Sequence, residues 1–137
     1  MKKLTLILFV FTLLVSSKII VAQNKLFTHQ DSLRGSVTRE RAWWDLTFYQ
    51  LDVKINPSDS TFIGANTIRY KVLTSLQVMQ IDLQQPMQII KVVQDGKSLD
   101  FKRDGSAWFI ELTKKQIAGD FNEITIDFSG KPKKESF

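Results

Sequence analysis

The sequence of 137 residues contains no cysteine and a single histidine, His29. The lack of cysteine excludes disulfide bonds, thiolate catalysis and the lipid-modified cysteine of bacterial lipoproteins. A zinc site needs three or four His, Cys, Asp or Glu side chains that converge on one point, and His29 has no partner within a helical turn. A serine nucleophile would also lack a base unless His29 folded back onto it. We predict that His29 is a solvated surface residue, and we assign no catalytic, cofactor-binding or metal-binding residue to this chain.

The sequence also lacks a glycine-rich loop before a predicted helix, so it has no phosphate-binding cradle. Carboxylates are numerous, and Asp95, Asp100 and Asp104 cluster in the sequence. Their spacing lacks the alternating ligands and the distal Glu of a calcium loop. A glycosidase acid and base can be chosen from any two carboxylates, so that interpretation is uninformative. Asp95 and Asp104 each precede a glycine, which favours a role in turns.

A long, almost wholly apolar run lies at the N-terminus. Lys2 and Lys3 precede the apolar run Leu4–Val15, and Ala22 ends a plausible cleavage site. This pattern is typical of a secretory signal peptide over residues 1–22. A membrane anchor is the alternative, but the apolar run is shorter than the ~20 residues of a spanning helix. We expect export to the periplasm or the cell exterior, with no stable membrane anchor after cleavage.

Cleavage would remove three of the 19 basic residues, which brings the remainder close to balance with the 14 acidic residues. We therefore infer no nucleic-acid or acidic-membrane partner. Residues 23–40 are polar and lack a hydrophobic period, so we predict an extended polar leader along the domain surface. Residues 41–137 are long enough for one domain with a single core.

The segment "YQLDVKINPSDSTFIGANTIRYKV", residues 49–72, alternates apolar and polar side chains. It predicts two half-buried antiparallel strands joined by a turn at Pro57–Ser60. Gly64 and Asn66 interrupt the inward series of the second strand, so we expect a bulge or a close backbone approach near them. The residues expected on the inward face are Tyr49, Leu51, Val53, Ile55, Phe62, Ile68, Tyr70 and Val72.

The same alternation continues through residues 79–84 and 123–128. Between these segments, Asp95-Gly96 and Asp104-Gly105 predict tight hairpin turns that separate three short strands.

The one break in the alternation is Lys114–Ala118. It is a candidate helical turn capped by Gly119, and we expect it to be only a connection. Roughly seven short strands at regular spacing predict an all-β fold, either an antiparallel sandwich or a barrel.

Trp43, Trp44 and Trp108 allow two interpretations. Sugar-binding sandwiches stack pyranose rings on exposed aromatic side chains, which is one option for these residues. Adjacent residues of a strand point to opposite faces, so one of Trp43 and Trp44 can lie in the core while the other covers a neighbouring element. The usual burial of tryptophan favours core or interface packing. Phe48 and Phe109 are expected on outward faces.

Three longer segments share an order of motifs: "DSLRGSVTRERAWWDLTFYQLDVKINPSDSTFIGANTIRYKV", "MQIDLQQPMQIIKVVQDGKSLDF" and "NEITIDFSGKPK". An arginine and aromatic residues precede "Y.LD", and "I.G.NTI.Y.V", "IDL..PM.I..V..DGK.L.F" and a strand ending in Gly and Pro follow. This order resembles the N-terminal domain of exported bacterial zinc aminopeptidases of the aminopeptidase N family. The resemblance extends from Asp31 to Pro132.

The resemblance implies a saddle-shaped β-sandwich without metal ligands of its own. In the family this domain packs on a thermolysin-like catalytic domain and helps to form the substrate cavity for peptide N-termini. The family's zinc-binding His-Glu-x-x-His helix, its Gly-x-Met-Glu-Asn segment and the glutamine of its N-terminal domain would all fall beyond Phe137, so no residue role is transferred. On this basis we expect a fragment whose sandwich is incomplete at its C-terminal end and which is inactive alone.

Two other functions stay open from the residues themselves. One is a stand-alone exported β-sandwich module that binds carbohydrate or protein through its aromatic residues. The other is an independent hydrolase that uses a pair of Asp or Glu side chains.

Overall fold

The computed structural model describes residues 27–133. The predicted signal peptide, residues 1–22, lies outside this range, as do residues 134–137. No helix within the described range is long and apolar enough to span a membrane. In chain order the elements are α2 (His29–Gly35), α3 (Arg39–Ala42), β1 (Trp44–Asn56), β2 (Thr61–Val72), β3 (Val78–Asp82), β4 (Gln88–Gln94), β5 (Lys97–Ser98), β6 (Phe101–Asp104), β7 (Ala107–Glu111) and β8 (Phe121–Gly130).

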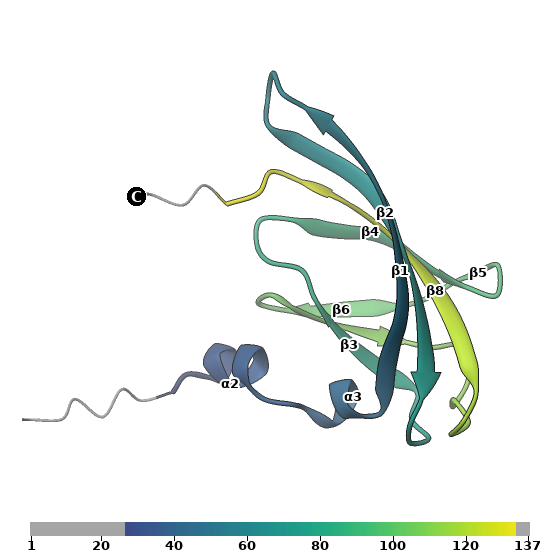
Figure 1. The fold of residues 1–137 in the computed structure, drawn as a ribbon. Helices are drawn as coiled ribbons and strands as arrows, with labels where there is room; N and C mark the ends of the chain where they lie inside the picture. The colour runs from purple at the N-terminus through teal and green to yellow at the C-terminus, as the bar shows by residue number, and fades with distance from the viewer. Residues whose placement is uncertain (1–26, 134–137) are drawn as a thin grey trace, which may run out of the picture.

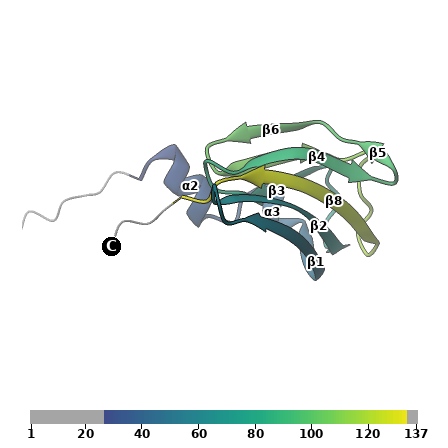
Figure 2. The ribbon, with the colours of Figure 1, turned by 90° about the horizontal axis from the view of Figure 1, so that it is seen from above.

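The strands form two antiparallel sheets. The larger sheet has five strands in the order β1-β2-β8-β4-β5, and the smaller has three in the order β3-β7-β6. The smaller sheet and the two helices lie on the concave side of the larger sheet (Figure 1). Seen from above, β1, β2, β8 and β4 follow one another across the larger sheet (Figure 2). The predicted all-β antiparallel sandwich is confirmed, with eight strands among residues 27–133 in place of about seven.

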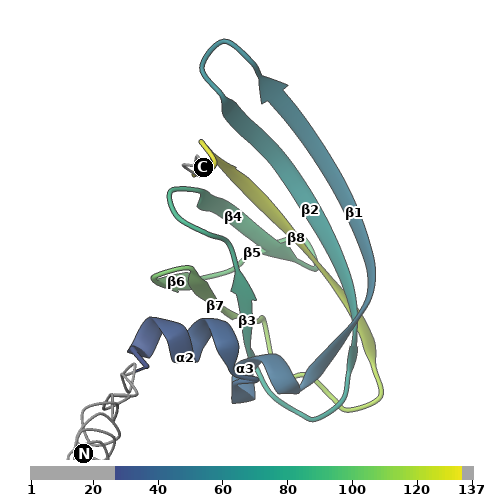
Figure 3. The same cartoon turned by 60° about the vertical axis from the view of Figure 1, so that its left-hand side comes forward.

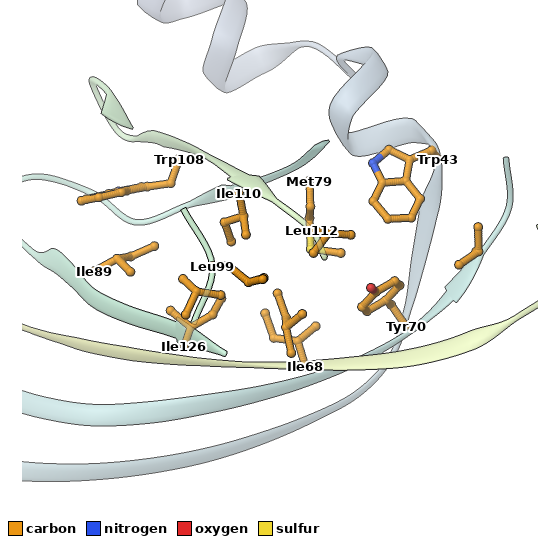
Figure 4. Packing of buried hydrophobic residues seen from close by; sticks show 13 residues of the cluster. Trp43, Ile68, Tyr70, Met79, Ile89, Leu99, Trp108, Ile110, Leu112 and Ile126 are labelled. Carbon is orange, nitrogen blue, oxygen red and sulfur yellow. The ribbon is translucent and has the colours of Figure 1, made fainter. Parts of the chain in front are cut away.

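The hydrophobic core lies between the two sheets. Trp108, Ile110 and Met79 face Ile68 and Ile126 across this space (Figure 4). Burial of such side chains stabilises the fold by about 1.5–3 kcal/mol each, so the contact between the sheets is the main source of stability. The core cluster comprises Trp43, Ile68, Tyr70, Val72, Met79, Ile89, Val92, Leu99, Trp108, Ile110, Leu112, Ile124 and Ile126.

Both predicted Asp-Gly turns are present. Asp95 and Gly96 have φ angles of 51° and 75°, the positive values that a tight hairpin turn of the primed type requires. They connect β4 to β5. Gly105, with φ of 62°, follows Asp104 in the second turn and begins the link from β6 to β7. The interpretation of Asp95 as a turn residue is confirmed. Asp104 itself is the last residue of β6, where it pairs with Ala107.

We predicted an extended conformation for the polar leader, residues 23–40. This prediction is wrong for His29–Gly35, which form the helix α2. The Thr28 hydroxyl accepts a hydrogen bond from the Asp31 N–H, and the Asp31 carboxylate accepts one from the Thr28 N–H. This capping box stabilises a helix whose sequence has no hydrophobic period. No residue of α2 is buried, so polar contacts attach the helix to the sandwich.

His29, the first residue of α2, has a partner that the sequence did not indicate. Its side chain is 69% exposed, and its Nε2 lies 2.7 Å from Asp104 Oδ2. The Gln30 amide donates to the other carboxylate oxygen, also at 2.7 Å. The hydrogen bond from His29, followed by that from Gln30, lowers the pKa of Asp104. The predicted surface position of His29 is confirmed. Folding brings the β6–β7 turn beside α2 and so supplies a partner that is distant in the sequence.

The segment Lys114–Ala118, a candidate helical turn expected to be only a connection, forms a loop without a helix between β7 and β8. Its backbone bonds to β2 and the residues that follow: the Gln116 N–H donates to the Leu76 carbonyl, and the Gly119 N–H donates to the Val72 carbonyl. These tertiary hydrogen bonds replace the local bonds of a helix. Gly119 has φ of 96°, a conformation that favours glycine.

Gly64 makes the close approach that was expected in β2. A Cβ at this position would clash with the Asp52 carbonyl oxygen of β1 and would lie 2.9 Å from Phe128 Cζ of β8. The ladder is regular at this point, and the register shifts lie elsewhere, between Leu46 and Phe48 and between Ile89 and Lys91. Gly64 therefore allows β1 and the Phe128 ring to approach β2.

A polar network lies inside the core around Tyr70, whose side chain is fully buried. The Tyr70 hydroxyl donates to Gln116 Oε1 and accepts from Gln94 Nε2, both at 3.1 Å. Gln94 Oε1 accepts from the Thr113 N–H and hydroxyl, and Gln116 Oε1 also accepts from Asn122 Nδ2. Burial raises the pKa of Tyr70, so the phenol stays protonated.

Candidate functional site

The inward apolar residues of β1 are largely uncovered. Tyr49 pairs with the buried Ile68 of β2, so the odd-numbered residues from Tyr49 onward share the inner face of the sheet as predicted. The prediction that this apolar face of β1 is buried is wrong. The exposed fractions are 51% for Tyr49, 61% for Leu51, 41% for Val53 and 55% for Ile55. The smaller sheet covers the other end of the hairpin, and β1 and β2 extend beyond it (Figure 3). We call these four side chains the β1 apolar stripe.

A groove begins where the β1 apolar stripe meets the core. It has a volume of about 640 Å³ and lies between the inner face of the larger sheet and β3. Its apolar wall includes Trp44, Leu46, Tyr49, Leu51, Ile89 and Phe128. Partial burial of the phenol raises the pKa of Tyr49, which keeps the group neutral and suited to an apolar wall.

One end of the groove is polar. The Arg41 guanidinium forms an ion pair with Asp82 and donates to the Ser36 carbonyl at 3.1 Å. In the amide orientation that pairs it with both Thr38 and Arg41, Gln80 donates to Thr38 Oγ1 at 2.6 Å and accepts from Arg41 Nε at 3.1 Å. The charge of Arg41 is thus compensated inside the chain, and the groove favours an uncharged, apolar occupant.

Asn66 lies on the groove wall among these apolar side chains. Its Oδ1 is buried and has no hydrogen-bond partner among residues 27–133. An unpaired buried acceptor costs about 1–3 kcal/mol.

The histidine and the three carboxylates singled out in the sequence lie at three separate places in the described range. No group of three or more His, Cys, Asp or Glu side chains within residues 27–133 is arranged to hold a metal ion. His29 and Asp104 lie together at the β6–β7 turn. Asp95 occupies the β4–β5 turn, and Asp100 is exposed just before β6.

The tryptophans serve mainly in packing, as the burial argument predicted. Trp43 and Trp108 are 2% and 4% exposed, and the Trp43 indole N–H donates to the Val78 carbonyl. Trp44 is partly buried, and its ring meets Tyr70 edge to face with the ring centroids 6.0 Å apart. Neither Trp43 nor Trp108 is accessible enough to stack on a sugar ring.

Phe48 lies on the outer face of the larger sheet and is 46% exposed, as expected. The Arg69 guanidinium covers its ring at 5.3 Å from the centroid.

We did not predict the uncovered inner face of β1 or the groove beside it from the sequence. The available signal was the small or polar pair Gly64 and Asn66 opposite the β1 apolar stripe.

No known protein family matches the sequence, and no curated protein matches it. Solved structures of M1 zinc metallopeptidases do match. A mutant of the M1 zinc metallopeptidase from Deinococcus radiodurans bound to a Tyr-Ser-Ala substrate has a TM-score of 0.62 at 14% identity, over 71% of this chain and 22% of that chain. The M1 zinc metallopeptidase from the same organism has a TM-score of 0.60 at 15% identity, over 67% and 21%.

A two-domain M1 zinc metallopeptidase mutant bound to L-tryptophan also has a TM-score of 0.60 at 15% identity. At these identities the likeness shows a shared fold. The chain spans about a fifth of the length of the metallopeptidases that it matches. The resemblance inferred from the sequence is therefore confirmed as one of fold, over a part of those enzymes.

Proposed function

We propose that this chain is the N-terminal β-sandwich portion of an exported zinc aminopeptidase of the M1 type. In this proposal it packs on the catalytic domain of the same longer polypeptide and helps to form the cavity that receives peptide N-termini. It corresponds to part of a saddle-shaped domain that further strands complete. The shared fold with M1 zinc metallopeptidases carries the proposal, together with the motif order of the sequence.

The uncovered inner face supports a packing role. The β1 apolar stripe continues the core into solvent, and exposed apolar patches of this kind mark interaction surfaces. The groove beside it has an apolar wall and compensated charges at one end. An uncharged, apolar segment would fit this groove.

The residues in hand do not fit a zinc ion, because no suitable group of ligands forms within residues 27–133. The proposal therefore places zinc in the catalytic domain and gives this chain no step of the hydrolysis. Export through residues 1–22, to the periplasm or the cell exterior, is part of the same proposal.

The first test measures zinc and activity on the purified full chain. We expect no stoichiometric zinc and no hydrolysis of aminoacyl anilides, because the chain supplies a wall and not the reacting groups. Turnover that a chelator abolishes would overturn the proposal. So would an uninterrupted reading frame after Phe137 that encodes no His-Glu-x-x-His helix.

The second test measures binding of the full chain to the zinc-peptidase domain of the same gene, expressed separately. Leu51→Asp should abolish the heat of binding in calorimetry, because it places a charge in the β1 apolar stripe. Gln50→Asp is the matched control, since it alters the opposite face of the same strand. Equal loss in both variants would contradict a role for the inner face. Saturable quenching by a glycan that is lost in Trp44→Ala would instead favour the carbohydrate-binding module.

A further inference from the structure

The edge of β1 is a second uncovered surface, distinct from the inner face. β1 is the outermost strand of the larger sheet, so the backbone groups on one side of it have no strand partner among the described residues. From Phe48 to Asn56, β1 pairs with β2 without a register shift. The turn end of the β1–β2 hairpin projects beyond the smaller sheet (Figure 3). Proteins usually protect such edges with charged side chains, bulges, prolines or short strands. Of these devices, this stretch has only the charged side chains Asp52 and Lys54.

The side chains on the two faces of this stretch differ in character. The inner face carries Leu51, Val53 and Ile55, which are exposed. The outer face carries the opposite charges Asp52 and Lys54, and neither joins an ion pair within the described residues. A partner strand for this edge must therefore match apolar residues on one face and a separated charge pair on the other.

We propose that two copies of this chain pair through their β1 edges, antiparallel, about a two-fold axis at Val53. Antiparallel pairing about that axis places a residue that precedes Val53 in one copy opposite the residue that follows Val53 by the same number of positions in the other copy. Asp52 of one copy then faces Lys54 of the other, twice per dimer. On the inner face, Leu51 of one copy faces Ile55 of the other, again twice.

Neighbouring registers are less favourable. If the two-fold axis lies at Asp52, the two Asp52 carboxylates face each other directly. If it lies at Lys54, the two Lys54 ammonium groups face each other. Like charges directly opposite on a sheet destabilise the pairing, whereas opposite charges stabilise it. The register centred on Val53 turns both charged residues into cross-strand ion pairs, and so the charge pattern selects a second copy in that register.

A self-crosslink tests this register, because the native chain has no cysteine. In the proposed dimer the two Val53 residues are directly opposite, with Cα atoms about 4.5–5.5 Å apart, within the 4.4–6.8 Å span of a disulfide. Val53→Cys in the purified full chain should form a covalent dimer on mild oxidation. Gln50→Cys is the matched control, since the two cysteines would lie roughly 20 Å apart at about 3.4 Å per residue. Equal crosslinking of both variants would overturn the proposal.

A charge exchange tests it without relying on cysteine. Sedimentation velocity should show a dimer for the unaltered chain, and Asp52→Lys should weaken that dimer on the order of tenfold through two like-charge contacts. The double variant Asp52→Lys with Lys54→Asp should restore it. A monomer at every concentration, or a double variant as weak as the single one, would overturn the proposal. Both measurements use this chain alone, so their outcome is separate from the test of binding to a peptidase domain.

Discussion

The β1–β2 hairpin contains two regions with the same alternating apolar pattern and opposite environments. On β2, Ile68, Tyr70 and Val72 are at most 2% exposed. On β1, the neighbouring residues of the same inner face, from Tyr49 to Ile55, are 41–61% exposed. The first region lies beneath the smaller sheet and the second extends past it. Alternation therefore determines which face a side chain takes, whereas the facing layer determines whether that face is buried.

The largest expected effect comes from the same substitution made in both regions. Ile68→Ala should lower the free energy of unfolding by about 2–5 kcal/mol, because it removes a fully packed side chain and leaves a cavity. Ile55→Ala should change it by less than about 0.5 kcal/mol, as surface substitutions usually do. Urea unfolding of the two variants measures both values. The measurement is made at a protein concentration at which the chain is monomeric, because the proposed edge dimer would pair Ile55 with Leu51 of the other copy. A comparable loss in the two variants would contradict the exposure of the β1 apolar stripe.

A smaller effect is expected at Gly64, which lies beside the boundary between the two regions. Gly64→Ala places a Cβ against the Asp52 carbonyl and the Phe128 ring, and such overpacking costs about 1–3 kcal/mol. Gly35→Ala is the control, because a Cβ there has no neighbour within 4 Å and alanine favours the helix. Thermal unfolding should show a lower midpoint for Gly64→Ala only. An unchanged midpoint would mean that β1 moves away from β2 at no cost.

The smallest effect concerns α2, which is attached by polar contacts. The pKa of Asp104 is lowered chiefly by the His29 hydrogen bond, so the contact is present above the ordinary Asp range and is lost as the pH falls through the lowered pKa. His29→Ala should raise the pKa of Asp104 toward its ordinary value of about 3.9. Gln30→Ala should raise it less, because its hydrogen bond contributes less. Carboxyl NMR titration measures both, and a greater effect of Gln30→Ala would contradict the structure.

Much of the fold was predictable because it depends on local patterns. The period of two identified the strands and their faces, and the Asp-Gly pairs supplied the positive φ values of tight turns. The close approach at Gly64 was also predictable from a local pattern. A glycine inside a strand often marks a place where a neighbouring group lies close to the backbone, and here the Asp52 carbonyl and the Phe128 ring do so.

The remaining features depend on long-range contacts. α2 depends on a capping box at Thr28 that was overlooked, and its attachment depends on Asp104, which is 75 residues from His29 in the sequence. The Lys114–Ala118 loop takes its backbone partners from β2 and the residues after it. The groove was missed because its existence depends on where the smaller sheet stops, and no residue of β1 encodes that position.

The hydroxyl of Tyr70 has a consequence for how reproducibly this chain folds. A slip of β2 by two residues against β8 would keep each side chain on its own face, so hydrophobic burial alone discriminates poorly against it. Such a slip would carry the phenol about 6.8 Å along the strand and leave the amides of Gln94 and Gln116 without their shared partner. A single oxygen atom thereby distinguishes the native alignment from its nearest competitor.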